Sequence, residues 1–485
     1  MNYRILIPVF LFLAAGCGTE VGPEPGKESP GGRAVLEGKL RLAGEYLESG
    51  RVKSAETLFR EIRKADPESA ESAAGLARVY LLTGRNAEAI RLGREAVRLD
   101  PRRAASWEDL GKAQAREGRL EDAAWSLRKA VQLEPGNPRY RNELGVALGQ
   151  LELYGEAVDA LAEAVALDPD YPEALNNLGM AHFQAGDPDR AEEFLDRALE
   201  VNPAYSKAYL NRGIVLRSRG ENEAALKNFT EALRHDPGLI PAYALAGTIH
   251  FEEGRFDRAA ADYREILSLS PNFAPAYIRL GEIALQLGDA EEAARKFEEA
   301  TALAPREPAA YALLSQARLE LGEYERAGTA ILWALNLAPD NPDYYRRAAE
   351  LFLARDQWRE AENALIRAKE IAPGDPETAL GLGRLYLRIR QPGKARKALE
   401  DTIALDPEGE AGREARGELD RLDGTGKPTP TAETGKVQHL WETVLPRTGT
   451  TPAAASDESD ESDGSDESDG SDGSDGSDWS DESDG

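Results

Sequence analysis

Apolar and small residues recur through the middle of this chain with a fixed period of 34 residues. Within each period, large apolar residues stand three or four positions apart with polar residues between them, which is the spacing of one buried helix face. A proline closes every period, from Pro67 to Pro407, and proline is typical of the end of a helix. The pattern therefore predicts an all-α fold with eleven units of two helices each over residues 36–409.

Two positions in every unit hold small residues. Position 8 is Gly, Ala or Ser throughout, and position 20 is always Ala, from Ala55 to Ala395. Small side chains let the two helices of a unit approach closely, while larger ones such as Tyr277, Leu280 and Phe297 fill the space around the crossing. Because no unit can bury its apolar face alone, we expect the units to stack into one solenoid with a continuous core.

The turn inside most units contains a glycine at position 15, which supplies the left-handed residue that ends the first helix. Glu152, Asp356 and Arg390 take this position in units 4, 10 and 11. Because a side chain disfavours the left-handed conformation, we expect these three units to turn differently or to fray.

A period of 34 residues with these small positions and a closing proline resembles the tetratricopeptide repeat. The resemblance implies a right-handed superhelical solenoid whose first helices line a concave groove for an extended peptide or a partner helix. It also implies that positions 5 and 6 of each unit point into that groove.

Seven polar residues at these positions are the candidate groove residues: Asn142, Asn176, Asn177, Asn211, Arg279, Arg346 and Arg347. Asn amides can pair with the N–H and C=O groups of a peptide backbone, and Arg side chains can receive an acidic peptide. The alternative is that all seven are ordinary solvated residues of a helix face.

The N-terminus reads as an export signal over residues 1–16, with Arg4 ahead of an apolar run that is too short to span a bilayer as a helix. The small residues before Cys17 resemble the lipobox of bacterial lipoproteins, which implies cleavage and a lipid anchor on Cys17. An ordinary cleaved signal is the alternative. Residues 17–35 are rich in Gly, Pro and charge, and predict a flexible stalk.

Three segments follow the eleventh unit. Residues 410–422 place apolar side chains on one stripe and predict a capping helix. Residues 423–455 predict a linker that contains a short amphipathic segment, 436–446. We expect this segment to dock on another protein or back onto the array. The alternative is that it is a chance apolar patch in the linker. Residues 456–485 repeat Ser-Asp and predict a disordered acidic tail, either a solubilising brush or a binding site for cations or a basic surface.

The net charge and the small numbers of Cys and His residues limit which ligands and reactions are expected. A net charge of −28 argues against nucleic acid as a partner, and one Cys and four His offer little for a metal site. The chain has no phosphate loop, nucleophile elbow or metalloprotease motif. We therefore expect no enzymatic activity, cofactor, metal or small-molecule substrate.

These features together predict a membrane-anchored scaffold that binds peptides or proteins. Gly18 in place of Asp after the lipobox resembles sorting to the outer membrane, so the expected location is the bacterial cell envelope, and the outer membrane in a Gram-negative cell. A narrower alternative is an accessory lipoprotein for envelope assembly, pilus or secretion, similar to pilotins.

Overall fold

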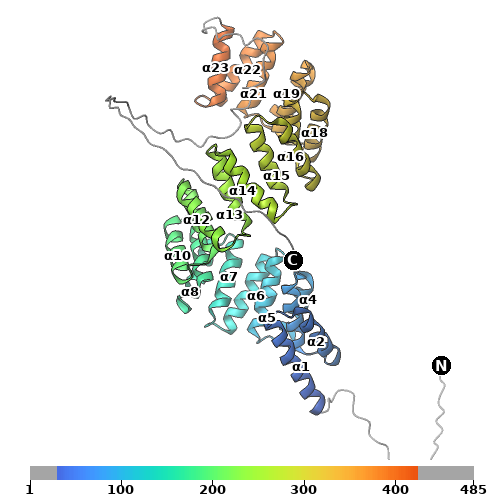
Figure 1. Ribbon diagram of the computed structural model, residues 1–485, viewed down its shortest axis with the longest axis vertical. Coiled ribbons are helices and arrows are strands. Elements are labelled where there is room, and N and C mark those ends of the chain that lie inside the picture. Colours follow the sequence, from blue (N-terminus) through green and yellow to red (C-terminus); the bar gives the residue numbers. More distant parts are fainter. Residues whose placement is uncertain (1–29, 424–485) are drawn as a thin grey trace, which may run out of the picture. The chain divides into compact units, whose positions relative to one another are not determined.

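The computed structural model describes residues 30–423, and this part of the chain consists of helices joined by short turns, with no strand (Figure 1). The predicted signal over residues 1–16, Cys17, the linker beyond residue 423, the segment 436–446 and the acidic tail 456–485 lie outside the described residues.

The first helices of the eleven units are α1 (Pro30–Glu48), α3 (Ala70–Leu82), α5 (Ala104–Arg116), α7 (Pro138–Gln150), α9 (Pro172–Gln184), α11 (Ser206–Ser218), α13 (Ile240–Glu252), α15 (Ala274–Gln286), α17 (Pro308–Glu320), α19 (Pro342–Ala354) and α21 (Pro376–Arg388). The second helices are α2 (Val52–Ala65), α4 (Asn86–Leu99), α6 (Leu120–Leu133), α8 (Tyr154–Leu167), α10 (Pro188–Val201), α12 (Asn222–His235), α14 (Phe256–Leu269), α16 (Ala290–Leu303), α18 (Tyr324–Leu337), α20 (Trp358–Ile371) and α22 (Pro392–Leu405). A last helix, α23 (Glu410–Leu422), follows the eleventh unit.

The helices form two compact bodies, one that ends at Gly374 and one that begins at Asp375. In the first body, each first helix packs on the second helix of its own unit, and each second helix from α2 to α18 packs on the first helix of the next unit. In the second body, α21 packs on α22, and α23 packs on both. Ala411 and Ala415 of α23 are buried in this contact. This stacking of helix pairs confirms the predicted all-α solenoid.

Small residues set the distance between the two helices of a unit. Every alanine at position 20 is at most 1% exposed, from Ala55 to Ala395. A Cβ atom on Gly281 would lie 2.5 Å from Cε1 of Phe297, a large residue at position 24 of the same unit. No carbon can approach that closely, so a side chain in place of Gly281 would push the two helices of this unit apart.

The turns of units 4, 10 and 11 do not differ from the others, so the expectation of altered turns is wrong. Glu152, Asp356 and Arg390 adopt φ angles of 61°, 56° and 58°, in the same left-handed region as the glycines elsewhere. The next residue of unit 4 also closes the turn as usual, because Leu153 N donates to the carbonyl of Leu148 at 3.0 Å. Packing of the flanking helices imposes this geometry, at a cost of about 1 kcal/mol per non-glycine residue.

The first helix begins earlier than predicted. α1 starts at Pro30, inside the stretch 17–35 that was predicted to be a flexible stalk, so that prediction is wrong for residues 30–35. Pro is favoured in the first turn of a helix because its missing N–H has no intrahelical partner there. The helix therefore begins six residues before the predicted first unit.

Candidate functional site

Four of the predicted groove residues form one hydrogen-bonded chain across three successive first helices, and we call them the asparagine ladder: Asn142 of α7, Asn176 and Asn177 of α9, and Asn211 of α11. Asn211 Nδ2 donates to Asn176 Oδ1 at 2.8 Å, and Asn177 Nδ2 donates to Asn142 Oδ1 at 2.9 Å. Within α9, Asn176 Nδ2 donates to Asn177 Oδ1 at 3.2 Å. The ladder thus fixes the spacing between units 4, 5 and 6.

The ladder retains capacity for a ligand on its outer side. Asn142 and Asn176 are buried, whereas Asn177 and Asn211 are half-buried. An amide group has two N–H donors and two acceptor lone pairs, and the bonds within the ladder use only part of them. A peptide backbone can therefore bond to Asn177 and Asn211 without breaking the ladder.

The predicted arginines are placed on first helices as expected, but each is already paired with a carboxylate. Arg279 of α15 pairs with Glu282 at 2.9 Å. In α19, Arg346 Nη2 and Arg347 Nε bind the two oxygens of Asp343 at 3.0 and 2.9 Å. Their positive charge is therefore partly neutralised before any acidic peptide arrives.

Arg347 also connects two units, because its Nη1 donates to Gln316 Oε1 of α17 at 2.6 Å. Burial raises the pKa of the nearby Glu350 to about 7, against the opposing effect of Arg347 and Arg346. Arg347 and Arg346 also hold the pKa of Asp343 below its ordinary value, although its burial acts in the opposite direction. Near neutral pH this group of two arginines and two acids therefore changes its net charge as Glu350 titrates.

A second charged group lies on α5 and α7, and sequence reasoning missed it. Buried Glu108 pairs with Arg139 at 2.6 Å, and Lys112 bridges Glu108 at 3.7 Å and Glu143 at 2.8 Å. Burial raises the pKa of Asp109 to about 6, although Arg78 and Lys112 favour its charged form. Glu108 and Asp109 occupy positions 5 and 6 of unit 3, so the rule that selected the asparagines would have found them had it been applied to acidic residues.

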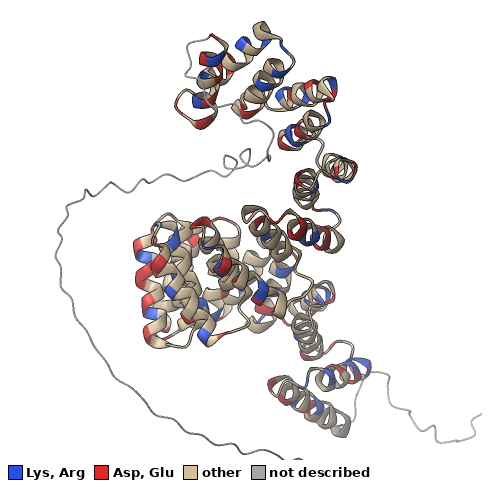
Figure 2. Cartoon of the chain, turned by 45° about the horizontal axis from the view of Figure 1, so that its top comes forward, with Lys and Arg blue, Asp and Glu red and all other residues tan. Residues whose placement is uncertain are grey.

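We call the surface formed by the asparagine ladder and these two charged groups the first-helix face. All of its residues come from first helices and lie in the body that ends at Gly374. Along the described helices, Lys and Arg positions are intermixed with Asp and Glu positions rather than separated by sign (Figure 2). The face therefore offers alternating patches of hydrogen-bonding and charged groups, suited to a mixed polar partner.

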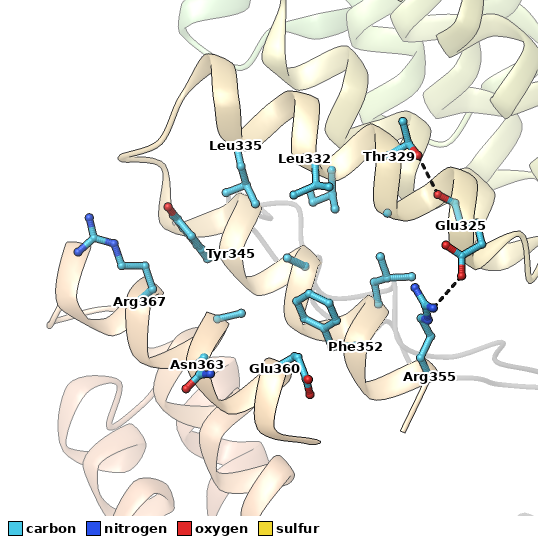
Figure 3. Close-up of a pocket in the computed structure, with 15 residues that line it drawn as sticks. Glu325, Thr329, Leu332, Leu335, Tyr345, Phe352, Arg355, Glu360, Asn363 and Arg367 are labelled. Carbon is cyan, nitrogen blue, oxygen red and sulfur yellow. Dashed lines mark hydrogen bonds and ion pairs between the residues drawn. The ribbon is translucent and has the colours of Figure 1, made fainter. Parts of the chain in front are cut away.

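A cavity of about 530 Å³ opens elsewhere, among α18, α19 and α20. Figure 3 shows Leu332 and Leu335 of α18 on one side of it and Asn363 and Glu360 of α20 on the other, with Phe352 of α19 between them. At one end, Arg355 Nη2 lies 2.7 Å from Glu325 Oε1. The cavity is lined mainly by apolar side chains, with charged residues at its rim.

Between residues 30 and 423, no group of three or more His, Cys, Asp and Glu side chains is arranged to hold a metal ion. In the same range, no helix has the length and apolar character needed to cross a membrane.

Two models of the tetratricopeptide repeat match the chain. One matches residues 150–211, 284–351 and 352–419, and the other matches residues 40–104, 92–138, 108–172, 210–274 and 244–308. Together the matches cover residues 40–419 without a gap. The chain therefore belongs to the tetratricopeptide repeat family. A comparison with curated proteins finds no match.

A comparison with solved structures finds several that are similar to this chain. Yeast Tom70 is 14% identical, with 81% of this chain and 96% of that chain covered and a TM-score of 0.39. A tetratricopeptide repeat protein from Parabacteroides merdae is 24% identical over 51% of this chain and 98% of its own, with a TM-score of 0.41. YrrB, described as a tetratricopeptide protein with an unusual peptide-binding site, is 23% identical over 38% and 95%, with a TM-score of 0.32.

Tetratricopeptide arrays are generally non-catalytic scaffolds that bind proteins or peptides, and this chain has the architecture of such a scaffold. The specific role of the seven predicted groove residues stays a prediction.

Proposed function

We propose that the first-helix face holds an extended segment of a partner protein. The observation that carries the proposal is the asparagine ladder, because its hydrogen bonds orient the half-buried amides of Asn177 and Asn211 on adjacent helices. Preoriented amides lose little conformational entropy when they bind a backbone, which favours a partner recognised by its extended conformation.

Charged residues precede and follow the asparagine ladder in the sequence. They would determine which side chains of the partner segment are accepted. Arg279, Arg346 and Arg347 favour acidic residues, while Glu108 and Asp109 favour basic ones. Because each of these groups is already paired within the array, their contribution is to specificity more than to affinity. The scaffold would therefore tolerate many sequences at the ladder and discriminate at its charged flanks.

A quantitative crosslinking pull-down from native envelopes tests this placement. The full-length protein is compared with the double variant Asn177→Ala, Asn211→Ala and with the control Asn336→Ala, which removes an exposed amide from the second helix α18. We expect the double variant to lose a defined set of partners by tenfold or more, while the control retains it. Equal recovery by all three proteins, with equal helix content by circular dichroism, would contradict the role of the ladder.

We further propose that Cys17 carries a lipid that anchors the array to a bacterial envelope membrane. The support is the lipobox resemblance and the position of the chain's single Cys. Metabolic labelling with an alkyne fatty acid should mark the wild type and leave Cys17→Ser unlabelled. An ordinary cleaved signal would give no label in either protein. If the labelled protein recovers pilus or secretion components, the narrower assembly role is supported.

A further inference from the structure

The second helix of unit 9 lacks the charge that the other units carry at two positions. Positions 25 and 26 of the other ten units hold at least one charged residue, whereas unit 9 has Leu332 and Trp333 there. Leu332 is 64% exposed and Trp333 is 52% exposed. The ring of Trp333 stacks on Tyr311 of α17, with the ring centroids 6.0 Å apart. Adjacent large apolar side chains that remain exposed in this way mark an interaction surface.

This apolar side of α18 continues into the cavity among α18, α19 and α20, and we call the cavity with Leu332 and Trp333 the unit-9 groove. Leu332 lines the cavity together with Leu335 of the same helix and Phe352 of α19 (Figure 3). The volume of about 530 Å³ is within the range of ligand-binding sites. The groove lies in the body that ends at Gly374, and its lining shares no residue with the first-helix face.

The walls of the groove favour a helical ligand over an extended one. The hydroxyl of Thr329 on one wall already donates to the carbonyl of Glu325 at 3.0 Å. Between residues 30 and 423 there is no strand with which an extended segment could pair. An extended backbone would therefore leave N–H and C=O groups unpaired against apolar walls, whereas a helix pairs these groups internally. The groove is suited to the apolar face of an amphipathic helix.

One carboxylate at the rim of the groove has no partner. Arg355 pairs with Glu325 at 2.7 Å, and Arg367 pairs with Glu370 at 3.0 Å, so these four charges are neutralised in pairs. Glu360, near the start of α20, is exposed. It forms no hydrogen bond or ion pair within the part of the chain that the structure describes. The rim therefore carries one negative charge that a basic side chain would complement.

The charge of the whole chain indicates which class of molecule would supply that basic side chain. A net charge of −28 repels a second copy of the chain and an anionic membrane surface, and attracts a basic protein. Asn363 on the cavity wall lies three residues beyond Glu360, about 5 Å along the helix axis. On a bound helix, residues three or four positions apart have a similar offset and lie on the same face.

We propose that the unit-9 groove binds an amphipathic helix of a basic partner protein. One aromatic or large aliphatic side chain of that helix enters the cavity, and a Lys or Arg three or four residues away pairs with Glu360. This binding surface goes beyond the function proposed for the first-helix face and does not depend on it.

Photocrosslinking with the full-length protein in native envelopes tests the proposal. Benzoylphenylalanine is introduced in place of Trp333, which keeps an aromatic ring beside the cavity. In a control protein it is introduced in place of Glu299, at the same position of unit 8. We expect mass spectrometry to find crosslinks from the Trp333 site, and none from the Glu299 site, to a partner segment with helical apolar spacing. That segment should carry a Lys or Arg three or four residues from an aromatic or large aliphatic residue.

Two charge substitutions link the crosslink to the groove. Leu332→Lys places a charge on the apolar wall and should reduce the yield at least about tenfold. Glu360→Lys replaces an attraction with a repulsion at the rim and should reduce the yield roughly fivefold. Glu265→Lys, which reverses an exposed charge at position 26 of unit 7, should leave the yield unchanged. Equal helix content by circular dichroism shows that each variant is folded.

Several results would overturn the proposal. Crosslinks to any part of this chain, to lipid, or to segments without a basic residue would each identify a different occupant. Absence of crosslinks from the Trp333 site, or an undiminished yield in the Leu332→Lys variant, would show that the groove binds no such helix. The double variant Asn177→Ala, Asn211→Ala should keep the crosslink, and its loss there would contradict a separate binding surface. Failure of the first-helix face as a binding site is thus distinguished from failure of the groove.

Discussion

Glu350 offers a quantitative test of how burial controls charge on the first-helix face. Its pKa lies at about 7, against an ordinary value of 4.5. Between these two values the folded chain holds a proton that the unfolded chain has released. Each pH unit in that interval lowers the free energy of unfolding by about 1.4 kcal/mol. Stability from this group is therefore greatest in acid and is lost as pH rises, by roughly 3 kcal/mol in total.

The substitution Glu350→Gln removes the titration while keeping the shape of the side chain. At about pH 5 the variant and the wild type should be nearly equally stable, because the native carboxyl is protonated there. At about pH 8 the variant should be more stable by roughly 3 kcal/mol, since it no longer keeps a charge in a half-buried position. Hydrogen exchange of the α19 amides, corrected for intrinsic rates, measures the local free energy of unfolding.

Glu299→Gln on the exposed side of α16 is the matched control, because it removes a carboxylate of the same size from a solvated position. Its stability difference from the wild type should not vary with pH in the same way. If the difference between Glu350→Gln and the wild type is the same at both pH values, burial does not raise the pKa of Glu350, and the charge change inferred for this group of residues is refuted.

Two further predictions concern the packing of the repeats. Gly281→Ala places a Cβ 2.5 Å from Phe297, so we expect a loss of about 1–3 kcal/mol in urea unfolding, while Gly136→Ala, with no atom near its added Cβ, should change little; equal effects would contradict the close helix approach. Glu152→Gly should stabilise unit 4 by about 1 kcal/mol because it relieves a left-handed side chain, and a decrease in the thermal midpoint would show that the Glu152 side chain contributes more than its backbone costs.

The fold could be predicted because every unit repeats the same small and large positions. A single glycine or alanine is weak evidence, but Ala55 to Ala395 recur in one register, and their burial follows directly from it. The half-buried amides of the ladder could also be predicted, because the family positions identify which helix face they occupy.

Interactions between units could not be predicted from the sequence. The hydrogen bond from Asn211 to Asn176 and the pairing of Arg347 with Gln316 depend on the rotation between successive units, which residue spacing does not specify. The cavity among α18, α19 and α20 was missed for a related reason, because it is formed by three helices from two units, whereas the repeat period describes one unit at a time. The left-handed turns at Glu152, Asp356 and Arg390 could not be predicted for a different reason, because tertiary packing there overrides the local backbone preference of the residue.

Those three turns also determine where the array is weakest. In a solenoid each unit contacts only its neighbours, so local openings need not unfold the whole chain. Units 5–9 contain only glycine at the turn position, and they form an uninterrupted block of relaxed turns. Units 4, 10 and 11 each carry stored backbone strain, so they are the natural points at which breathing begins and at which a protease would first find an open backbone.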